Sequence, residues 1–303
     1  MRTLVVGAGA VGGYFGGRLA EKGADVTFLV RPRRAAQLQR EGLVIRSRHG
    51  DALLRVKTVL SDEIRQPFDL VILSVKAYHL PDVRESLGAA VGERTVVLPL
   101  LNGIRHMDLL KQWFGPEKVL GGLCFVEATL NKHGHVLQYS PRHELVYGET
   151  DGSDSPRVRR IQALLAGANM ESRLSTEIMK DMWMKYAFIA GFSGMTCLMR
   201  SPLGPILKAP GGKETYLRLL EEIHAVARHH EPSLPEDLAA TILAQMESLN
   251  ESMKSSMLRD MEKGLPVEAD HLQGSLLEMA PPGTDLPLLK AVYASLKAYE
   301  QTR

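Results

Sequence analysis

The first half of the chain alternates continuous apolar runs with segments of helical periodicity. Runs rich in β-branched residues lie at 3–9, 25–30, 69–75, 95–101 and 118–129. Apolar residues at every position, rather than at every second one, are typical of strands that are buried on both faces of a parallel sheet. The intervening segments "YFGGRLAEKG" and "LPDVRESLGAAVG" have helical spacing and end at glycine. This alternation predicts a doubly wound α/β sheet that includes all five runs.

Two further pairs of short runs indicate antiparallel additions to that sheet. Residues 43–47 with 53–59, and 134–140 with 143–149, have the pattern of β-hairpins. A loop rich in Gly, Ser, Asp and Pro follows at 148–158, and strand signals stop soon after "MESRLSTEIM". From about residue 176 onward nearly every segment has helical periodicity. We therefore expect an α/β domain over 1–174 and an all-helical domain over 175–303.

The composition excludes several classes of protein. With 303 residues, 45% hydrophobic and 24% charged, the chain has the composition of a soluble globular protein large enough for two domains. No apolar run reaches the roughly 18 residues of a membrane span, and the N-terminus enters a strand too early for a signal peptide, so we expect a cytoplasmic protein without membrane contacts. A net charge of +2 argues against a nucleic-acid partner. Isolated cysteines and the lone pair His133 and His135 give no metal site.

The segment "GAGAVG" at 7–12, which comprises Gly7, Ala8, Gly9, Ala10, Val11 and Gly12, fits the dinucleotide-binding pattern G-x-G-x-x-G. It follows a predicted strand and opens a predicted helix, which is the context that the pattern requires. Gly7 permits a tight turn, Gly9 lets a pyrophosphate approach the backbone, and Gly12 lets helix and strand pack closely. The anion would lie at the helix N-terminus.

The end of the second strand indicates which dinucleotide is bound. Folds that prefer NAD place an acid there, whereas this chain has "FLVRPRR". The paired donors of Arg31 suit a 2′-phosphate, so we expect NADP(H). Arg33 and Arg34 are read equally well as a solvated basic turn or as part of the cofactor site.

Other polar residues stand at positions that favour chemistry. Lys76 and Asn102 each follow a predicted parallel strand, at the edge of the sheet where ligands bind. Lys185 lies in the most apolar part of the second half, on one helical face with Ile189 and Ser193. A buried ammonium needs a carboxylate, and Asp260 and Glu268 are the candidates. The alternative is that Lys185 extends to the surface from an apolar helix.

At these residues the chain resembles the ketopantoate reductase (2-dehydropantoate 2-reductase) family. The similarity covers essentially the whole length, through "GAGAVGGYFGGRLAEKGADVTFLVR", "SVKAYHL", "PLLNGI", "WMKYAFIAGFSGMTCL", "SSMLRDMEKGLPVEADHLQG" and "PPGTDLPLLKAVYASL". It implies an N-terminal Rossmann domain and a C-terminal domain like that of 6-phosphogluconate dehydrogenase. It also implies the NADPH-dependent reduction of a 2-oxo acid in the cleft between them, most simply of ketopantoate to pantoate in pantothenate biosynthesis. A homodimer is compatible with this resemblance.

The resemblance also implies roles for individual residues. The family's glycine loop falls on Gly7, Gly9 and Gly12, its phosphate-binding arginine on Arg31 and a cofactor-binding lysine on Lys76. Its nicotinamide-side asparagine, which also faces substrate, falls on Asn102. The catalytic lysine falls on Lys185, the carboxylate-binding serine on Ser256 and the active-site acid on Glu268. A lysine ammonium can stabilise the charge that forms on a ketone oxygen and supply the proton, with Glu268 keeping the lysine charged.

Three departures from the family pattern concern the substrate. The best-studied members carry asparagine at the positions of Ile189, Ser193 and Met253, of which the first two would face substrate here. Replacement of amides by apolar bulk favours a less polar 2-oxo acid. Reduction of such an acid, or of an imine, therefore stays open beside ketopantoate. An NADP(H)-binding sensor without turnover is the alternative from another class, although a sensor has no need of Lys185 with Glu268.

Overall fold

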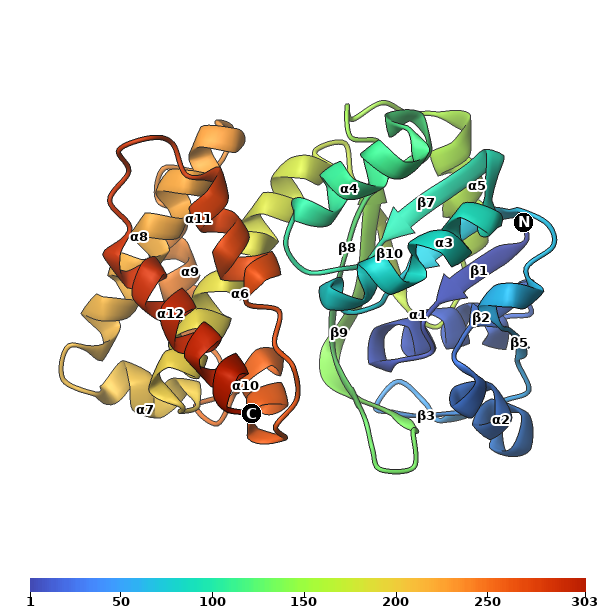
Figure 1. The fold of residues 1–303 in the computed structure, drawn as a ribbon, viewed down its shortest axis with the longest axis horizontal. Helices are drawn as coiled ribbons and strands as arrows, with labels where there is room; N and C mark the ends of the chain where they lie inside the picture. Colours follow the sequence, from blue (N-terminus) through green and yellow to red (C-terminus); the bar gives the residue numbers. More distant parts are fainter. The chain divides into compact units, whose positions relative to one another are not determined.

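The computed structural model describes residues 1–303 and divides into two compact units. The N-terminal unit comprises Met1–Leu101 and His106–Ile178, and the C-terminal unit comprises Asn102–Arg105 and Met179–Arg303. The short Asn102–Arg105 segment thus belongs to the C-terminal unit. The single predicted boundary at 174/175 assigns this segment to the N-terminal domain instead. Each unit is described by itself below (Figure 1).

The N-terminal unit is built on a five-stranded parallel sheet with the order β5-β2-β1-β6-β7. Its strands are β1 (Thr3–Val6), β2 (Val26–Leu29), β5 (Lys57–Val59), β6 (Phe68–Leu73) and β7 (Val91–Pro99). The central strand β1 is buried at every residue, as its continuous apolar pattern predicts. Chain order reverses direction at β1, which confirms the doubly wound, Rossmann-type fold.

The N-terminal unit also contains helices and short 3₁₀ turns. They are α1 (Ala10–Glu21), α2 (Pro32–Glu41), η1 (Ser61–Glu63), η2 (Ala77–His79), α3 (Leu80–Ala90), α4 (Arg105–Phe114), η3 (Pro116–Lys118) and α5 (Pro156–Leu165). In Figure 1, α3 runs beside the strand β7.

A second sheet in the same unit corrects two sequence-based predictions. It contains β3 (Leu43–Ser47), β4 (Ala52–Leu54), β8 (Gly121–Leu130), β9 (Val136–Gly148) and β10 (Glu171–Leu174). The run at 118–129 contains a strand, but it does not extend the parallel sheet, to which an isolated bridge between Val97 and Val119 links it. It pairs instead with β9 in antiparallel fashion. The predicted pairing of β3 with β4 is confirmed, whereas residues 57–59 form β5 in the first sheet.

The prediction of a hairpin over 134–149 is wrong, because Val136–Gly148 form the single strand β9. Along β8, Val126 is paired with His143 and Ala128 with Gln138, so 139–142 bulge out opposite Glu127. The Ser140 hydroxyl accepts a hydrogen bond from the Glu127 amide at 2.8 Å and fills the gap in the ladder. Pro141, which has no N–H to donate, therefore lies in a bulge rather than in a turn.

Helix α1 packs against strands of both sheets because its inner face carries glycine. A Cβ on Gly16 would lie 2.8 Å from the side chains of Phe28 and Val5, and one on Gly17 would lie 2.6 Å from Ile45. Backbone and strand side chains thus come into direct contact on both sides. The position of α1, and with it the loop that precedes it, is fixed by this packing.

A buried polar cluster lies where α1 meets β9. The Tyr14 hydroxyl is 2.7 Å from Nδ1 of His143, and the His143 ring stacks on His49 at 3.6 Å. Arg18, fully buried, lies over the Tyr14 ring and donates to the carbonyl oxygen of Gly50 at 2.6 Å. Burial, together with the neighbouring His49 and Arg18 and against the opposing effect of Glu171, lowers the pKa of His143.

Over Met179–Arg303 the C-terminal unit contains helices and no strand, as predicted. They are α6 (Ile178–Met199), α7 (Leu203–Lys208), α8 (Gly212–His230), α9 (Leu238–Glu247), α10 (Ser256–Glu262), the π-helical turn η4 (Asp270–Gly274), α11 (Ser275–Met279) and α12 (Pro287–Thr302). Small residues of α6 allow close packing, since a Cβ on Gly191 would lie 2.5 Å from the Leu220 side chain of α8. None of the helices combines the length and the apolar character that crossing a membrane requires.

Acid should destabilise the N-terminal unit through His143. Because its folded-state pKa is lowered, the unfolded chain takes up the proton first, and stability falls as the pH drops below about 6.5. We expect the melting temperature to fall less between pH 7.5 and 5.5 in His143→Gln than in wild type. The exposed His133→Gln variant is the control, and an unchanged pH response of His143→Gln would contradict the assignment.

Candidate active site

The glycine loop between β1 and α1 requires glycine at two positions, for different reasons. Gly7 has φ +96°, in the left-handed region, and Gly12 lies against the loop that it follows. A Cβ on Gly12 would lie 2.1 Å from both the Gly7 carbonyl oxygen and the Ser74 Oγ. Gly7 and Gly12 are therefore required for the turn and for the packing of α1 on it.

Gly9 has the opposite surroundings, and these fit a bound phosphate. A Cβ built on Gly9 meets nothing within 4 Å. Gly9 is the N-cap of α1, no side chain caps the helix, and its first turn carries no acid. The backbone N–H groups of the first turn and the positive end of the helix dipole thus suit an anion. The residues present fit the pyrophosphate of a dinucleotide.

Ser74 contacts this loop from the end of strand β6, and sequence reasoning missed it. Its hydroxyl lies 3.0 Å from the Val6 carbonyl oxygen and 3.3 Å from that of Gly7, so it can donate to either. Ser74 follows β6 and ties the end of that strand to the turn after β1. The signal in the sequence was the first polar residue after the apolar run at 69–73.

Arg31 follows β2 and occupies the N-cap of α2, with 72% of its side chain exposed. Its guanidinium lies 3.3 Å from Nδ1 of His79 and 3.5 Å from Asp82, both near the start of α3. Arg31 is thus an accessible cation near the carboxyl end of the sheet. Lys76 lies at the same edge, half-buried between β6 and η2.

The other two arginines of this segment differ from each other. Arg33 is exposed. Arg34 is half-buried and donates to the Gly134 carbonyl oxygen and to Gln37, both at 2.8 Å, and burial lowers its pKa. The interpretation of Arg34 as a solvated residue is therefore wrong, because its guanidinium fastens α2 to the loop before β9.

In the C-terminal unit, Lys185 and Glu268 are both buried, with 9% and 8% of their surface exposed. Lys185 lies on α6, with Ile189 half-buried one turn later and Ser193 2% exposed a further turn on. Glu268 lies just before the π-helical turn η4. A π-helical turn inside a helical segment is frequently found at functional sites.

Two sets of hydrogen bonds fasten α6 to the segment after Glu268. The Tyr186 hydroxyl, next to Lys185 in sequence, donates to the Leu272 carbonyl oxygen at 2.5 Å and lies 2.6 Å from the Ser275 Oγ. The Gln273 amide donates to the Ala190 carbonyl oxygen at 3.1 Å and to the Ser193 Oγ at 3.0 Å. The helix of Lys185 and the turn of Glu268 are thus held in one arrangement.

The Ser193 hydroxyl is fully engaged in this contact. It donates to the Ile189 carbonyl oxygen at 2.7 Å while it accepts from Gln273. Neither Tyr186 nor Gln273 was singled out from the sequence. Only the fold shows that they are buried and join α6 to η4.

The backbone of Asn102 contacts the same turn, η4. Its carbonyl oxygen is 2.9 Å from Nε2 of His271, and Gly103, with φ +77°, follows it. Burial lowers the pKa of His271, and Arg105 acts in the same direction, whereas Glu268 and the bond to Asn102 oppose the shift. Asn102 and Glu268, two predicted site residues that are far apart in the sequence, are therefore linked through η4.

Ser256 and Met253 lie at the start of α10. Ser256 is the first residue of that helix and is exposed, whereas its neighbour Ser255 is the N-cap and accepts from the Leu258 amide at 3.1 Å. Met253 is half-buried and accepts a hydrogen bond from the Leu203 amide through its carbonyl oxygen.

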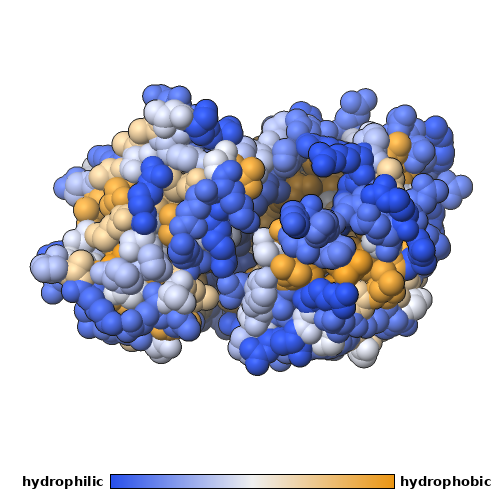
Figure 2. Space-filling model, turned by 90° about the horizontal axis from the view of Figure 1, so that it is seen from below, coloured by the Kyte–Doolittle hydropathy of each residue, from blue (hydrophilic) through white to orange (hydrophobic).

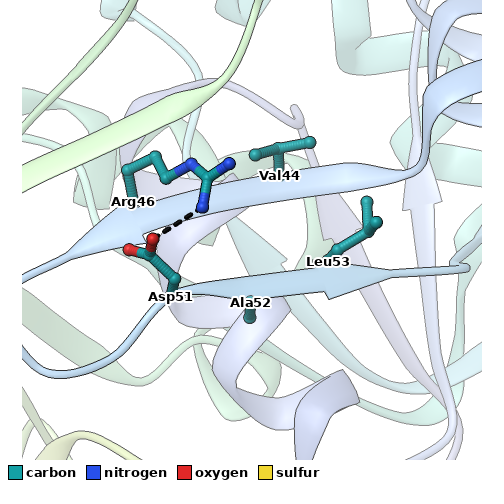
Figure 3. Close-up of a pocket in the computed structure, with 5 residues that line it drawn as sticks. All are labelled: Val44, Arg46, Asp51, Ala52 and Leu53. Carbon is teal, nitrogen blue, oxygen red and sulfur yellow. Dashed lines mark hydrogen bonds and ion pairs between the residues drawn. The ribbon is translucent and has the colours of Figure 1, made fainter.

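A separate surface pocket of about 280 Å³ lies on β3 and β4, lined by Val44, Arg46, Asp51, Ala52 and Leu53. Figure 3 shows Val44 and Leu53 on one face of the two strands, with Arg46 joined to Asp51 at 2.6 Å. Leu53 is 69% exposed. Figure 2 shows hydrophobic residues lying among hydrophilic ones on the surface of the N-terminal unit. This pocket contains none of the residues predicted for cofactor or substrate.

Comparisons with known proteins place the chain in a family. Residues 3–152 match the family described as Ketopantoate reductase PanE/ApbA, and residues 177–300 match its C-terminal part. An uncharacterized oxidoreductase, YkpB of Bacillus subtilis, is 45% identical over 99% of both chains. A 2-dehydropantoate 2-reductase of Archaeoglobus fulgidus is 27% identical over 91% of this chain and 90% of its own.

Solved structures agree with this placement. A 2-dehydropantoate 2-reductase from Geobacter metallireducens superposes with a TM-score of 0.90 at 27% identity, with 100% of each chain covered. A D-mandelate dehydrogenase, solved with NADH and anilino(oxo)acetate, has a TM-score of 0.89 at 21% identity and covers 100% of this chain and 99% of its own. The second likeness is one of fold alone. With both family segments matched along nearly the whole chain, the protein belongs to the ketopantoate reductase family of oxidoreductases.

Proposed function

We propose that the protein reduces a 2-oxo acid to the 2-hydroxy acid with NADPH, with Lys185 as the proton donor. The observation that carries this proposal is a buried lysine on α6 whose neighbour, Tyr186, is hydrogen-bonded to the turn that follows the buried Glu268. An ammonium in such a place is costly unless a carboxylate stabilises it. In an oxidoreductase, this energetic cost is explained if the buried ammonium takes part in the reaction.

The chain's own residues divide the work as follows. The dinucleotide, when bound, supplies the hydride to the ketone carbon. Lys185 stabilises the negative charge that develops on the ketone oxygen and donates a proton to it, and Glu268 keeps Lys185 charged. Asn102 orients the groups on the nicotinamide side, and Ser256 binds the substrate carboxylate.

The glycine loop and the two basic residues hold the cofactor in this proposal. The N–H groups after Gly9 receive the pyrophosphate, while Arg31 and Lys76 take the charges at the carboxyl edge of the sheet. The exposed guanidinium of Arg31 favours NADPH over NADH.

Ketopantoate is the substrate that the family name supports, and a less polar 2-oxo acid is the second candidate. Ile189 and Met253 replace amides with apolar side chains, and the Ser193 hydroxyl is engaged by Ile189 and Gln273. In our proposal Ser193 therefore shapes the wall of the site rather than donating to substrate. The mandelate dehydrogenase neighbour, by its name, acts on an aryl hydroxy acid.

We also propose a homodimer, because a ketopantoate reductase of Staphylococcus aureus with a TM-score of 0.84 is described as dimeric. Sedimentation of the purified protein measures this independently of activity.

The function is tested by NADPH oxidation with ketopantoate, an aliphatic series of 2-oxo acids and phenylglyoxylate, with Lys185→Met beside wild type. We expect turnover of one member and a loss of about 10²-fold or more in kcat for the variant, because the proton donor is removed. Lys208→Met, at an exposed lysine of the same unit, is the control.

Each result of this assay decides between the candidates. Preference for ketopantoate would show that Ile189 and Met253 are tolerated, and preference for phenylglyoxylate would favour the second candidate. Tight NADPH binding without any turnover would overturn the proposed reaction and support the sensor.

Arg31→Ala should reduce the preference for NADPH. The loss of charge-assisted hydrogen bonds to the 2′-phosphate should weaken NADPH binding by about tenfold or more and leave NADH binding unchanged. Titration of cofactor fluorescence measures both constants. Arg33→Ala serves as the matched control, and an equal loss for both cofactors would argue against a 2′-phosphate contact.

Gly9→Ala should separate folding from cofactor binding. The added methyl group meets no protein atom, so the melting temperature should stay close to that of wild type, whereas the pyrophosphate can no longer approach the backbone. We expect NADPH affinity to fall by about tenfold or more, as for a lost charged hydrogen bond. Gly88→Ala on α3, also in open space, should leave affinity unchanged, and unaltered binding by Gly9→Ala would place the phosphate elsewhere.

A further inference from the structure

The turn after Glu268 makes hydrogen bonds in two directions within the C-terminal unit. Leu272, Gln273 and Ser275 contact α6, as described above. His271 instead contacts the Asn102–Arg105 segment, which carries the asparagine proposed for the nicotinamide side. The imidazole is thus the hydrogen-bonding side chain of η4 that reaches Asn102.

The contact between His271 and this segment is close and directional. Nε2 lies 2.9 Å from the Asn102 carbonyl oxygen, and a carbonyl only accepts, so Nε2 carries the hydrogen. The ring also covers the next residue, since a Cβ on Gly103 would lie 3.2 Å from both Nε2 and Cδ2 of His271. This segment also forms an ion pair between Arg105 and Glu278 at 3.4 Å, which joins exposed side chains and contributes little.

We propose that His271 is a positioning residue, which fixes the Asn102–Gly103 peptide on the turn that follows Glu268 and so aims the Asn102 side chain. This inference rests on the proposed function and deepens it. Gly103, with φ +77°, gives the peptide a freedom that other residues lack. The bond from His271 selects one orientation of that peptide.

The charge of the ring matters as well as its shape. Glu268 and Arg105 are the charged groups that act on the imidazole, and burial with Arg105 lowers its pKa despite Glu268. A ring that stays neutral at neutral pH leaves the Glu268 carboxylate available for Lys185. Uncharged variants therefore test the hydrogen bond without adding a new charge.

The experiment compares two substitutions at this position. His271→Phe keeps a ring against Gly103 but cannot donate, whereas His271→Gln places an amide N–H near the position of Nε2. Tyr293→Phe removes a hydrogen bond of 2.7 Å from the neighbouring Asp270 and is the matched control on the same turn. If His271→Phe does not fold, His271→Met replaces it.

We expect His271→Phe to lower kcat by about tenfold or more, because small displacements of orienting groups are costly. The KM for the 2-oxo acid should change less, and His271→Gln should recover most of kcat. Hydrogen exchange of the 101–110 segment should be faster in His271→Phe and near wild type in His271→Gln. Tyr293→Phe should change neither quantity.

The exchange measurement separates this inference from the proposed reaction. If wild type turns over no 2-oxo acid, the reaction fails, and exchange at 101–110 still decides whether His271 holds Asn102. Unchanged exchange and unchanged kcat in His271→Phe would overturn the positioning role. An equal loss of kcat in His271→Phe, His271→Gln and Tyr293→Phe would also overturn it, since that pattern reports general loosening of the turn.

Discussion

The cost of burying an ammonium group is the constraint on which the C-terminal unit depends. Lys185 lies in the apolar middle of α6, and water cannot supply the solvation that it loses. The groups around the Lys185 ammonium must therefore be held rigidly and must present polar atoms to it. Tyr186 and Gln273 meet this need by fastening α6 to the turn of Glu268 at two points, about one helical turn apart. These hydrogen bonds hold the helix of Lys185 and the turn after Glu268 in one arrangement.

The fold followed closely from the sequence where local pattern and global packing agree. The central strand β1 is buried at every residue because both faces of the sheet are covered, and Gly12 is required by contacts that a single methyl group would break. The second sheet was harder to predict. Pro141 reads as a turn, yet the Ser140 hydroxyl replaces a lost ladder bond and lets β9 continue. Whether a break in pattern is a turn or a bulge depends on the partner strand, which no local window contains.

In the candidate site, too, some residues could be predicted from the sequence and others could not. Gly9, Arg31 and Lys76 could be proposed from their places beside strand ends, because parallel strands bring their carboxyl ends to one edge. His271 could not, since its contact with Asn102 joins residues 169 positions apart. Arg34 resembled Arg31 and Arg33 in sequence, and only its contact with Gly134 gives it a different role.

The pairing of Ser193 with Gln273 has a consequence for the redesign of specificity. The serine side chain is short, and the longer amide of Gln273 spans the distance to α6 and uses both the Ala190 carbonyl and the Ser193 hydroxyl. An asparagine introduced at 193 alone would meet an amide that already fills the space. The two positions therefore form one exchangeable unit, and a transplant of the amide-rich wall of other reductases would have to replace them together.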